Sequence, residues 1–149
     1  RVPPSFLLEE ECHRNMSFTL YHASSMPRIA FGEVSVEPAG EDLYKVWIEV
    51  RNEGMIPTRI EQDVKNHINP PDVITMPEER VVSSGRVADR YFKRVDPVLV
   101  RPYRVELPTI PGLGAERVQF IVRGKAPVVV TVESTKGGRM QREIGLTAP

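Results

Sequence analysis

The strongest constraint on the fold comes from residues 43–58, which read LYKVWIEVRNEGMIPT. From Tyr44 onward, apolar residues alternate with polar or larger aromatic ones, which is the period-two pattern of a half-buried β-strand. The alternation stops at Asn52, and Gly54 and a Pro-Thr corner follow at once. Because asparagine, glycine and proline favour turns, the segment predicts a strand that ends in a tight turn.

Similar but shorter patterns continue to the C-terminus, and they predict a mainly β protein. The 14 prolines and 10 glycines suit short strands with stiff connections. We expect an Ig-like antiparallel β-sandwich of about seven strands, preceded by one N-terminal α-helix. The strands are drawn from residues 29–36 (with a bulge at Gly32), 43–51, 73–76, 81–83, 98–100, 103–107, 117–123, 128–133 and 140–146, and the core is expected to include Val46, Ile48, Phe120 and Val130.

Residues 1–27 have a helical pattern instead. Ser5 is a suitable N-cap, Glu10 and Arg14 have the spacing of an ion pair, and Pro27 ends the segment. One apolar stripe runs along the predicted helix at Leu8, Cys12, Met16 and Leu20. Such a helix must pack on the sandwich or on a domain outside this sequence. We therefore divide the chain into a helix and linker at 1–27, interpreted as the tail of an absent upstream domain, and a sandwich at 28–149.

A second, shorter helix is predicted between the strands. Residues 59–69 are mostly polar, and Ile60, Val64 and Ile68 recur at a spacing of four. This spacing predicts a short helix or a helical crossover.

Charge and composition exclude several functions. The 20 basic and 20 acidic residues cancel, which gives no electrostatic basis for binding nucleic acid or an anionic membrane. No apolar run approaches the roughly 20 residues of a membrane-spanning helix. The single cysteine, Cys12, excludes an internal disulfide. The sequence starts at Arg1 and shows no signal peptide, so we interpret it as a fragment of a longer protein.

Candidate metal and catalytic residues are few. Glu10 and His13 form a Glu-x-x-His pair, but a carboxylate di-iron site needs a second such pair. Zinc needs three or four converging ligands, and only His13, His22 and Cys12 offer a long-range combination. Five aspartates offer oxygens for calcium without forming a calcium loop: Asp42, Asp63, Asp72, Asp89 and Asp96. We therefore predict no catalytic, cofactor-binding or metal-binding residue in this sequence.

Trp47 is the main candidate for an interaction. It lies on the otherwise polar face of the predicted strand, beside Lys45, Glu49 and Arg51, and these four residues form the predicted interaction surface. Either another element covers this face, with the N-terminal helix or an absent domain favoured, or Trp47 is presented to a partner such as a sugar. The locally basic residues 86–104 are interspersed with acids and are interpreted as a solvated face.

Three segments resemble the C-terminal region of large bacterial zinc carboxypeptidases of the M14 type. They are PPSFLLEEECHRNMSFTLYHASSMP, LYKVWIEVRNEGMIPT and RVQFIVRGKAPVVVTVESTKGGRMQREIGL. The resemblance implies that a β-sandwich follows a catalytic domain that ends in a helix. The His-x-x-Glu pair and distant histidine of that family's zinc site have no counterpart in this sequence, so zinc is expected only in the upstream domain.

The resulting hypothesis is a non-catalytic accessory sandwich that packs on the catalytic domain of a metallocarboxypeptidase. The alternative is an independent module that binds carbohydrate or cell wall through Trp47. A third hypothesis is a small enzyme with a site built from His13, His22 and Cys12. A periplasmic or extracellular location follows from the resemblance alone.

Overall fold

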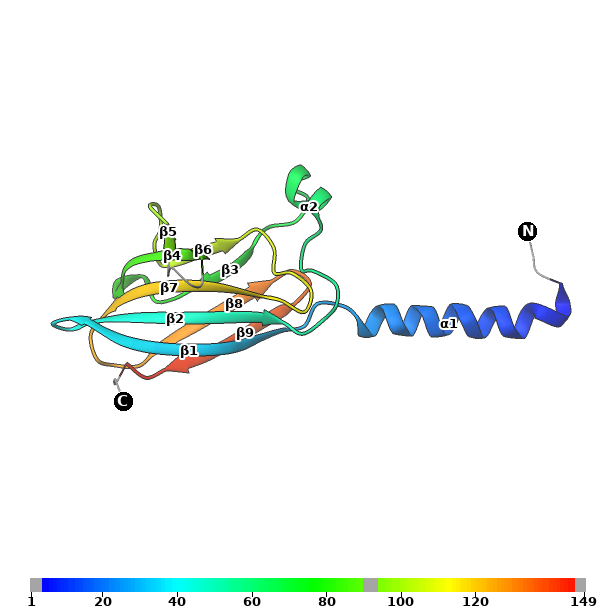
Figure 1. Cartoon of the computed structure of the whole chain (residues 1–149), viewed down its shortest axis with the longest axis horizontal. Helices are drawn as coiled ribbons and strands as arrows, with labels where there is room; N and C mark the ends of the chain where they lie inside the picture. Colours follow the sequence, from blue (N-terminus) through cyan, green and yellow to red (C-terminus); the bar gives the residue numbers. More distant parts are fainter. Residues whose placement is uncertain (1–3, 90–93, 147–149) are drawn as a thin grey trace.

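The computed structural model describes residues 4–89 and 94–146, and it confirms the mainly β fold. In these residues nine strands, rather than about seven, form two antiparallel sheets (Figure 1). The five-stranded sheet has the order β1 (Ile29–Gly40), β2 (Leu43–Asn52), β7 (Ala115–Arg123), β4 (Val81–Asp89) and β5 (Arg94–Pro97). The four-stranded sheet has the order β6 (Arg104–Leu107), β3 (Asp72–Thr75), β8 (Val128–Ser134) and β9 (Gly138–Ile144). The helices are η1 (Ser5–Leu7), α1 (Leu8–Ser24), α2 (Glu61–Asn66) and η2 (Glu78–Arg80).

The hydrophobic core lies between the two sheets. Every second residue of β2 and β7 points inward, and Val46 pairs with Phe120 across the two strands, as Ile48 pairs with Val118. The predicted core residues Val46, Ile48, Phe120 and Val130 are all buried, which confirms the assignment of the strand faces. Because side chains alternate along a strand, the odd-numbered residues of β2 face outward from the five-stranded sheet.

Strand β1 is the outer edge of the five-stranded sheet and contains the predicted bulge. Its pairing with β2 shifts in register between Phe31 and Val34. A Cβ atom at Gly32 would overlap side-chain atoms of Glu49 and Arg51 on β2, so glycine allows the close approach that the bulge makes. β1 runs to Gly40, so only residues 41–42 form the turn into β2, which is shorter than expected.

Helix α1 extends away from the sandwich instead of packing on it (Figure 1). Residues 4–24 are all exposed apart from the half-buried Glu11. Of the two expected arrangements, packing of the apolar stripe on the sandwich is therefore wrong for the described chain, and packing on another domain stays a prediction. The predicted pair of Glu10 and Arg14 is present, with 2.7 Å between Oε1 and Nη2. The predicted cap is wrong, because Ser5 begins the short helix η1 and the N-cap of α1 is Leu7.

The joint between α1 and the sandwich is held by the turn that follows β2. The Ile56 N–H donates to the Ser25 carbonyl at 3.1 Å, and the Arg28 N–H donates to Asn52 Oδ1 at 3.1 Å. A Cβ atom at Gly54 would overlap the Met26 carbonyl. The Asn-x-Gly stop therefore ends the strand and also fixes the chain that enters the sandwich.

The second helix is present at Glu61–Asn66, and two of the isoleucines that predicted it are not buried. Ile60 and Ile68 are exposed, and Asp63 is buried instead. The Asp63 carboxylate accepts hydrogen bonds from the backbone N–H and the side-chain amide of Asn69, at 2.8 and 2.9 Å. The helix is thus fixed by polar contacts, because Asp63 ties its end to the following loop.

One predicted strand is absent from the described residues. Residues 98–100 form a loop, and the side chains of Leu99 and Val100 are 88% and 77% exposed. Strand β5 lies just before this loop, at Arg94–Pro97, where no strand was predicted. None of the described helices is long and apolar enough to cross a membrane.

Candidate functional site

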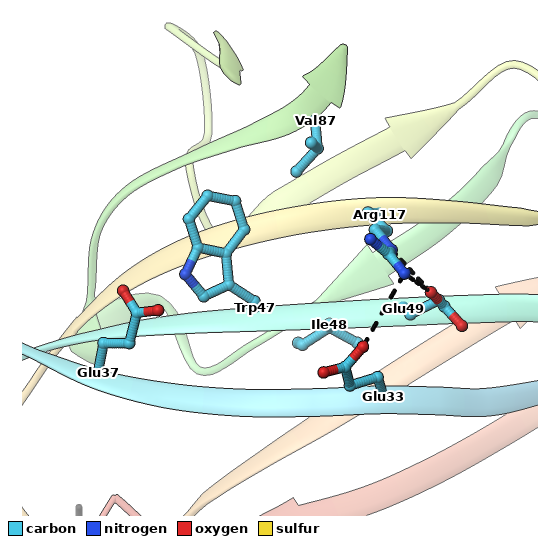
Figure 2. A pocket seen from close by; sticks show the side chains of 7 residues that line it. All are labelled: Glu33, Glu37, Trp47, Ile48, Glu49, Val87 and Arg117. Carbon is cyan, nitrogen blue, oxygen red and sulfur yellow. Dashed lines mark hydrogen bonds and ion pairs between the residues drawn. The ribbon is translucent and has the colours of Figure 1, made fainter. Parts of the chain in front are cut away.

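A small pocket lies on the outer face of the five-stranded sheet, where the sequence places Trp47. It has a volume of about 120 Å³, and strands β1, β2, β4 and β7 contribute to it. Its lining residues are Glu33, Glu37, Trp47, Ile48, Glu49, Val87 and Arg117 (Figure 2). The hairpin of β1 and β2 and two strands from later in the sequence, β4 and β7, therefore converge on one site.

One end of the pocket is formed by a carboxylate between two arginines. Glu49 pairs in register with Arg117 on β7, and its Oε2 accepts a hydrogen bond from Arg117 Nε at 2.7 Å. The other carboxylate oxygen, Oε1, accepts a hydrogen bond from Arg51 Nε. Although Glu49 lies on the outer face, it is only 4% exposed. The arginines thus supply the partners that a buried carboxylate needs.

These contacts determine the ionisation of Glu49. Burial alone would raise the pKa of this carboxyl group, but hydrogen bonds and charge interactions with Arg51 and Arg117 outweigh burial and lower the pKa. Glu49 is therefore held as a carboxylate at neutral pH.

The Trp47 ring forms one wall of the pocket. It is half-buried, and Figure 2 shows its ring between Glu37 on one side and Arg117 on the other. Across the sheet its register partner is Gln119, which in turn pairs with Gly85 on β4. Two forms of coverage were favoured for Trp47: coverage by the N-terminal helix is wrong because α1 points away from the sheet (Figure 1), and coverage by an absent domain stays a prediction.

Two glutamates of β1 complete the pocket. Glu33 lies in the bulge, and its Oε2 is 3.9 Å from Arg117 Nη2, while its side chain is 69% exposed. Glu37 lies further along β1, in register with Lys45. The pocket therefore combines an indole wall with carboxylates from the edge strand.

The structure brings the four predicted surface residues onto one face, with different roles. Trp47 and Glu49 line the pocket, Arg51 supports Glu49 from the side, and Lys45 lies beside Glu37. Four lining residues on other strands were not predicted: Glu33, Glu37, Val87 and Arg117. The outward position of Arg117 follows from its alternation with Val118, but only the register shows that it faces Glu49.

The metal candidates do not converge. Within residues 4–89 and 94–146 there is no group of three or more His, Cys, Asp or Glu residues that could hold a metal ion. His13, His22 and Cys12 lie on the exposed helix α1. In the locally basic segment 86–104, Arg94 Nε lies 3.8 Å from Asp96 Oδ1. Residues 90–93 of this segment lie outside the described part of the chain.

Two carboxyl groups outside the pocket have shifted pKa values. Hydrogen bonds from Asn69 lower the pKa of Asp63 despite burial, and nearby Arg59 and Lys136 act in the same direction. Burial raises the pKa of Glu116, and the opposing charge of Arg86 only partly offsets it. Neither group lines the Trp47 pocket.

Comparisons with known proteins give a family for most of the chain without naming an activity. The family described as Domain of unknown function (DUF8731) matches residues 28–145. No curated protein matches the chain. A solved structure titled "Apo PCuAC domain from PmoF1" is similar at 13% identity with a TM-score of 0.45, and the likeness covers 83% of this chain and 97% of that one.

These matches correct the resemblance to M14-type carboxypeptidases. The family that matches residues 28–145 is not described as part of a peptidase, so the resemblance and the accessory function that it implied are wrong. The physical reason lies in the residues that carried the resemblance. Asn52 and Gly54 end a strand, and Gly54 has no Cβ atom that would overlap the Met26 carbonyl. Gly138 adopts a positive φ of 85° in a hairpin. These are requirements of turns in many sandwiches, and they carry no information about a neighbouring enzyme.

Proposed function

This chain belongs to the family described as Domain of unknown function (DUF8731), and we propose that it is a non-catalytic binding domain. Its pocket beside Trp47 would receive one positively charged side chain, lysine or arginine, of a peptide or protein partner. The observation that carries the proposal is the combination, in one cavity, of a half-buried indole and the carboxylates of Glu33 and Glu37.

The size of the pocket supports a ligand group of this kind. Its volume is about 120 Å³, and a cavity measured in this way needs only about 10–15 Å³ to hold one water molecule. The cavity therefore has room for the end of one side chain and is too small for a drug-sized ligand.

The chemistry of the lining supports a positive charge. A cation over the face of an indole is attracted by the ring, with a contribution of about 0.5–1 kcal/mol at exposed sites. Glu33 and Glu37 add two carboxylates beside Trp47, and Arg117 contacts both Glu33 and Glu49. An incoming cation would meet the carboxylates of β1 because they lie on the edge strand, where the Glu33 side chain is 69% exposed.

The state of Glu49 supports a binding role over an acid–base role. A general acid or base works best when its pKa lies near the operating pH. The pKa of Glu49 is lowered, and two arginines occupy its oxygens. This carboxylate therefore organises the pocket rather than exchanging protons with a substrate.

The test uses the fact that Trp47 is the only tryptophan of the sequence, so intrinsic fluorescence reports on this site. The protein is titrated with Nα-acetylated argininamide, and with Nα-acetylated citrullinamide as the neutral ligand of nearly the same shape; the acetyl group removes the α-amino charge from both. We expect saturable changes with argininamide that weaken as salt is added, and much weaker changes with citrullinamide. Equal responses to both ligands would contradict the proposal.

Matched variants show which carboxylates are involved. Glu33→Gln and Glu37→Gln should each weaken argininamide binding by up to about fivefold, because an exposed ion pair contributes about 0.2–1 kcal/mol. Glu41→Gln, an exposed acid in the β1–β2 turn, removes the same charge outside the pocket and should leave binding unchanged. Saturation of the fluorescence change by neutral oligosaccharides, without any effect of argininamide, would replace the proposal by glycan binding.

A further inference from the structure

A second, larger pocket adjoins the Trp47 pocket at the end of β2. It has a volume of about 590 Å³ and shares three lining residues with the Trp47 pocket: Glu33, Glu49 and Arg117. Arg51 and Glu53 also line it, and we call it the Arg51 pocket. A ligand held beside Trp47 can therefore extend into this second space.

The Arg51 side chain is held in place by β1 and β2. Its Nε donates a hydrogen bond to Glu49 Oε1. A Cβ atom at Gly32 on β1 would overlap Arg51 Nε, so the absence of a side chain there makes room for the guanidinium. The Arg51 side chain nevertheless remains 55% exposed. The guanidinium is thus positioned by its surroundings and still accessible from the pocket.

The outer N–H groups of Arg51 are available to a ligand. Among residues 4–89 and 94–146, Glu49 is the only partner of the Arg51 side chain, and it engages Nε alone. The two Nη groups of a guanidinium form a planar fork that can donate two parallel hydrogen bonds to a carboxylate. Arg51 therefore offers a fork whose orientation is set and whose donors are free.

Each acid that lines the Arg51 pocket has an arginine partner other than this fork. Glu53 Oε2 lies 3.3 Å from Arg28 Nε. Glu33 and Glu49 both contact Arg117 (Figure 2). Together with the free fork, three arginines match the three acids. A carboxylate that enters the pocket would therefore meet no excess of negative charge.

The distance between the two pockets suits an extended peptide. Side chains on one face of a strand recur at every second residue, about 7 Å apart. Trp47 and Glu49 have this spacing on β2, and the Arg51 guanidinium reaches back to Glu49. A peptide that lies along β2 with its basic side chain beside Trp47 would place the residue two positions away at the fork.

We propose that Arg51 binds the carboxylate of an acidic residue that lies two positions from the basic residue of the partner. The partner segment is then basic-x-acidic or acidic-x-basic, according to its direction along β2. This inference rests on the proposed function, because the cation beside Trp47 sets the position of the peptide. Arg51 selects among basic segments those that carry the acid.

The test compares acetylated and amidated tripeptides by Trp47 fluorescence at low salt. Arg-Ala-Glu and Glu-Ala-Arg are each titrated beside the same peptide with glutamine in place of glutamate. We expect at least one glutamate peptide to bind about two- to fivefold more tightly than its glutamine counterpart, which is the range of an exposed ion pair. Equal affinities within both pairs would overturn the inference.

Two variants assign the preference to Arg51. In Arg51→Gln the preference for glutamate should vanish, while Nα-acetylated argininamide still binds. Lys125→Gln removes the same charge from the exposed turn between β7 and β8 and should keep the preference. A preference that persists in Arg51→Gln would overturn the inference.

Two further outcomes separate this inference from the proposed function. If Nα-acetylated argininamide binds but the acid adds nothing, only the role of Arg51 fails; if no arginine ligand binds, both fail. The peptide Arg-Glu-Ala places the acid on the opposite side of an extended chain and should show a smaller gain over Arg-Gln-Ala. An equal gain from this adjacent acid would refute the spacing of two.

Discussion

Replacing Asn52 by alanine tests whether the turn after β2 holds the sandwich and the entering chain together. The Asn52 side chain is 1% exposed and makes three close hydrogen bonds. Its Oδ1 accepts from the N–H groups of Arg28 and Gly54 at 3.1 and 3.0 Å, and its Nδ2 donates to the Ile56 carbonyl at 2.8 Å. Asn52→Ala removes all three contacts and leaves their backbone partners unsatisfied.

The size of the effect follows from these partners. Leaving one buried polar group unsatisfied costs about 1–3 kcal/mol. Arg28 is exposed, so water can replace its lost partner, whereas Gly54 is buried and Ile56 is half-buried. We therefore expect Asn52→Ala to lower the free energy of unfolding by about 2–5 kcal/mol.

The assay is urea unfolding followed by Trp47 fluorescence, with linear extrapolation to water. Asn66→Ala is the matched control, because Asn66 is exposed at the end of α2 and should change stability by less than about 0.5 kcal/mol. A loss below about 1 kcal/mol for Asn52→Ala would refute the argument that this side chain is a structural link.

Three further predictions concern the core, the joint and pH. Phe120→Ala should lower the free energy of unfolding by about 3–5 kcal/mol in urea melts, because Phe120 is fully buried. Lys45→Ala should lower it by less than about 0.5 kcal/mol. Similar losses for both variants would mean that the strand faces are misassigned. Gly54→Ala should lower the thermal midpoint because its Cβ would overlap the Met26 carbonyl; an unchanged midpoint would contradict this close approach. Because the pKa of Glu49 is lowered by folding, its ionised form stabilises the protein above the ordinary glutamate pKa of about 4.3. That contribution is lost as the pH falls through the folded-state pKa. The free energy of unfolding should therefore fall less steeply at low pH in Glu49→Gln than in the wild type. An unchanged fall would exclude Glu49 as the cause of the acid sensitivity.

The long central strands could be predicted from the sequence because packing on one face imposes a strict alternation. Val46 and Ile48 face the core and Phe120 meets Val46 across the sheet, as the period of two requires. The same rule placed Trp47 on the outer face.

Shorter elements were harder to predict because local contacts outweigh hydrophobicity in them. Residues 98–100 are apolar, yet they lie in the loop that connects the two sheets, where Val98 packs against the core and Leu99 and Val100 are exposed. In α2, the isoleucines at the helix spacing are exposed, and Asp63 is buried because Asn69 satisfies its oxygens. Hydrophobic spacing does not report such a polar contact.

The site was only partly predictable because it is assembled by register. The residues of β2 could be identified from one strand pattern, but Arg117 comes from a strand 68 residues away in the sequence. Glu33 owes its position to the bulge that Gly32 permits. Neither relation is visible before the pairing of the strands is known.

The bulge in β1 has a consequence for solubility. A 12-residue strand at the edge of a sheet exposes unpaired backbone groups along one side, and such an edge can recruit strands from other molecules. The register shift at Gly32 interrupts the straight run of these groups, and Pro38 lacks an N–H to offer. Glu33 and Glu37 add like charges that oppose the approach of a second identical edge. Strand β1, which borders the pocket, thus also opposes edge-to-edge aggregation of the sheet.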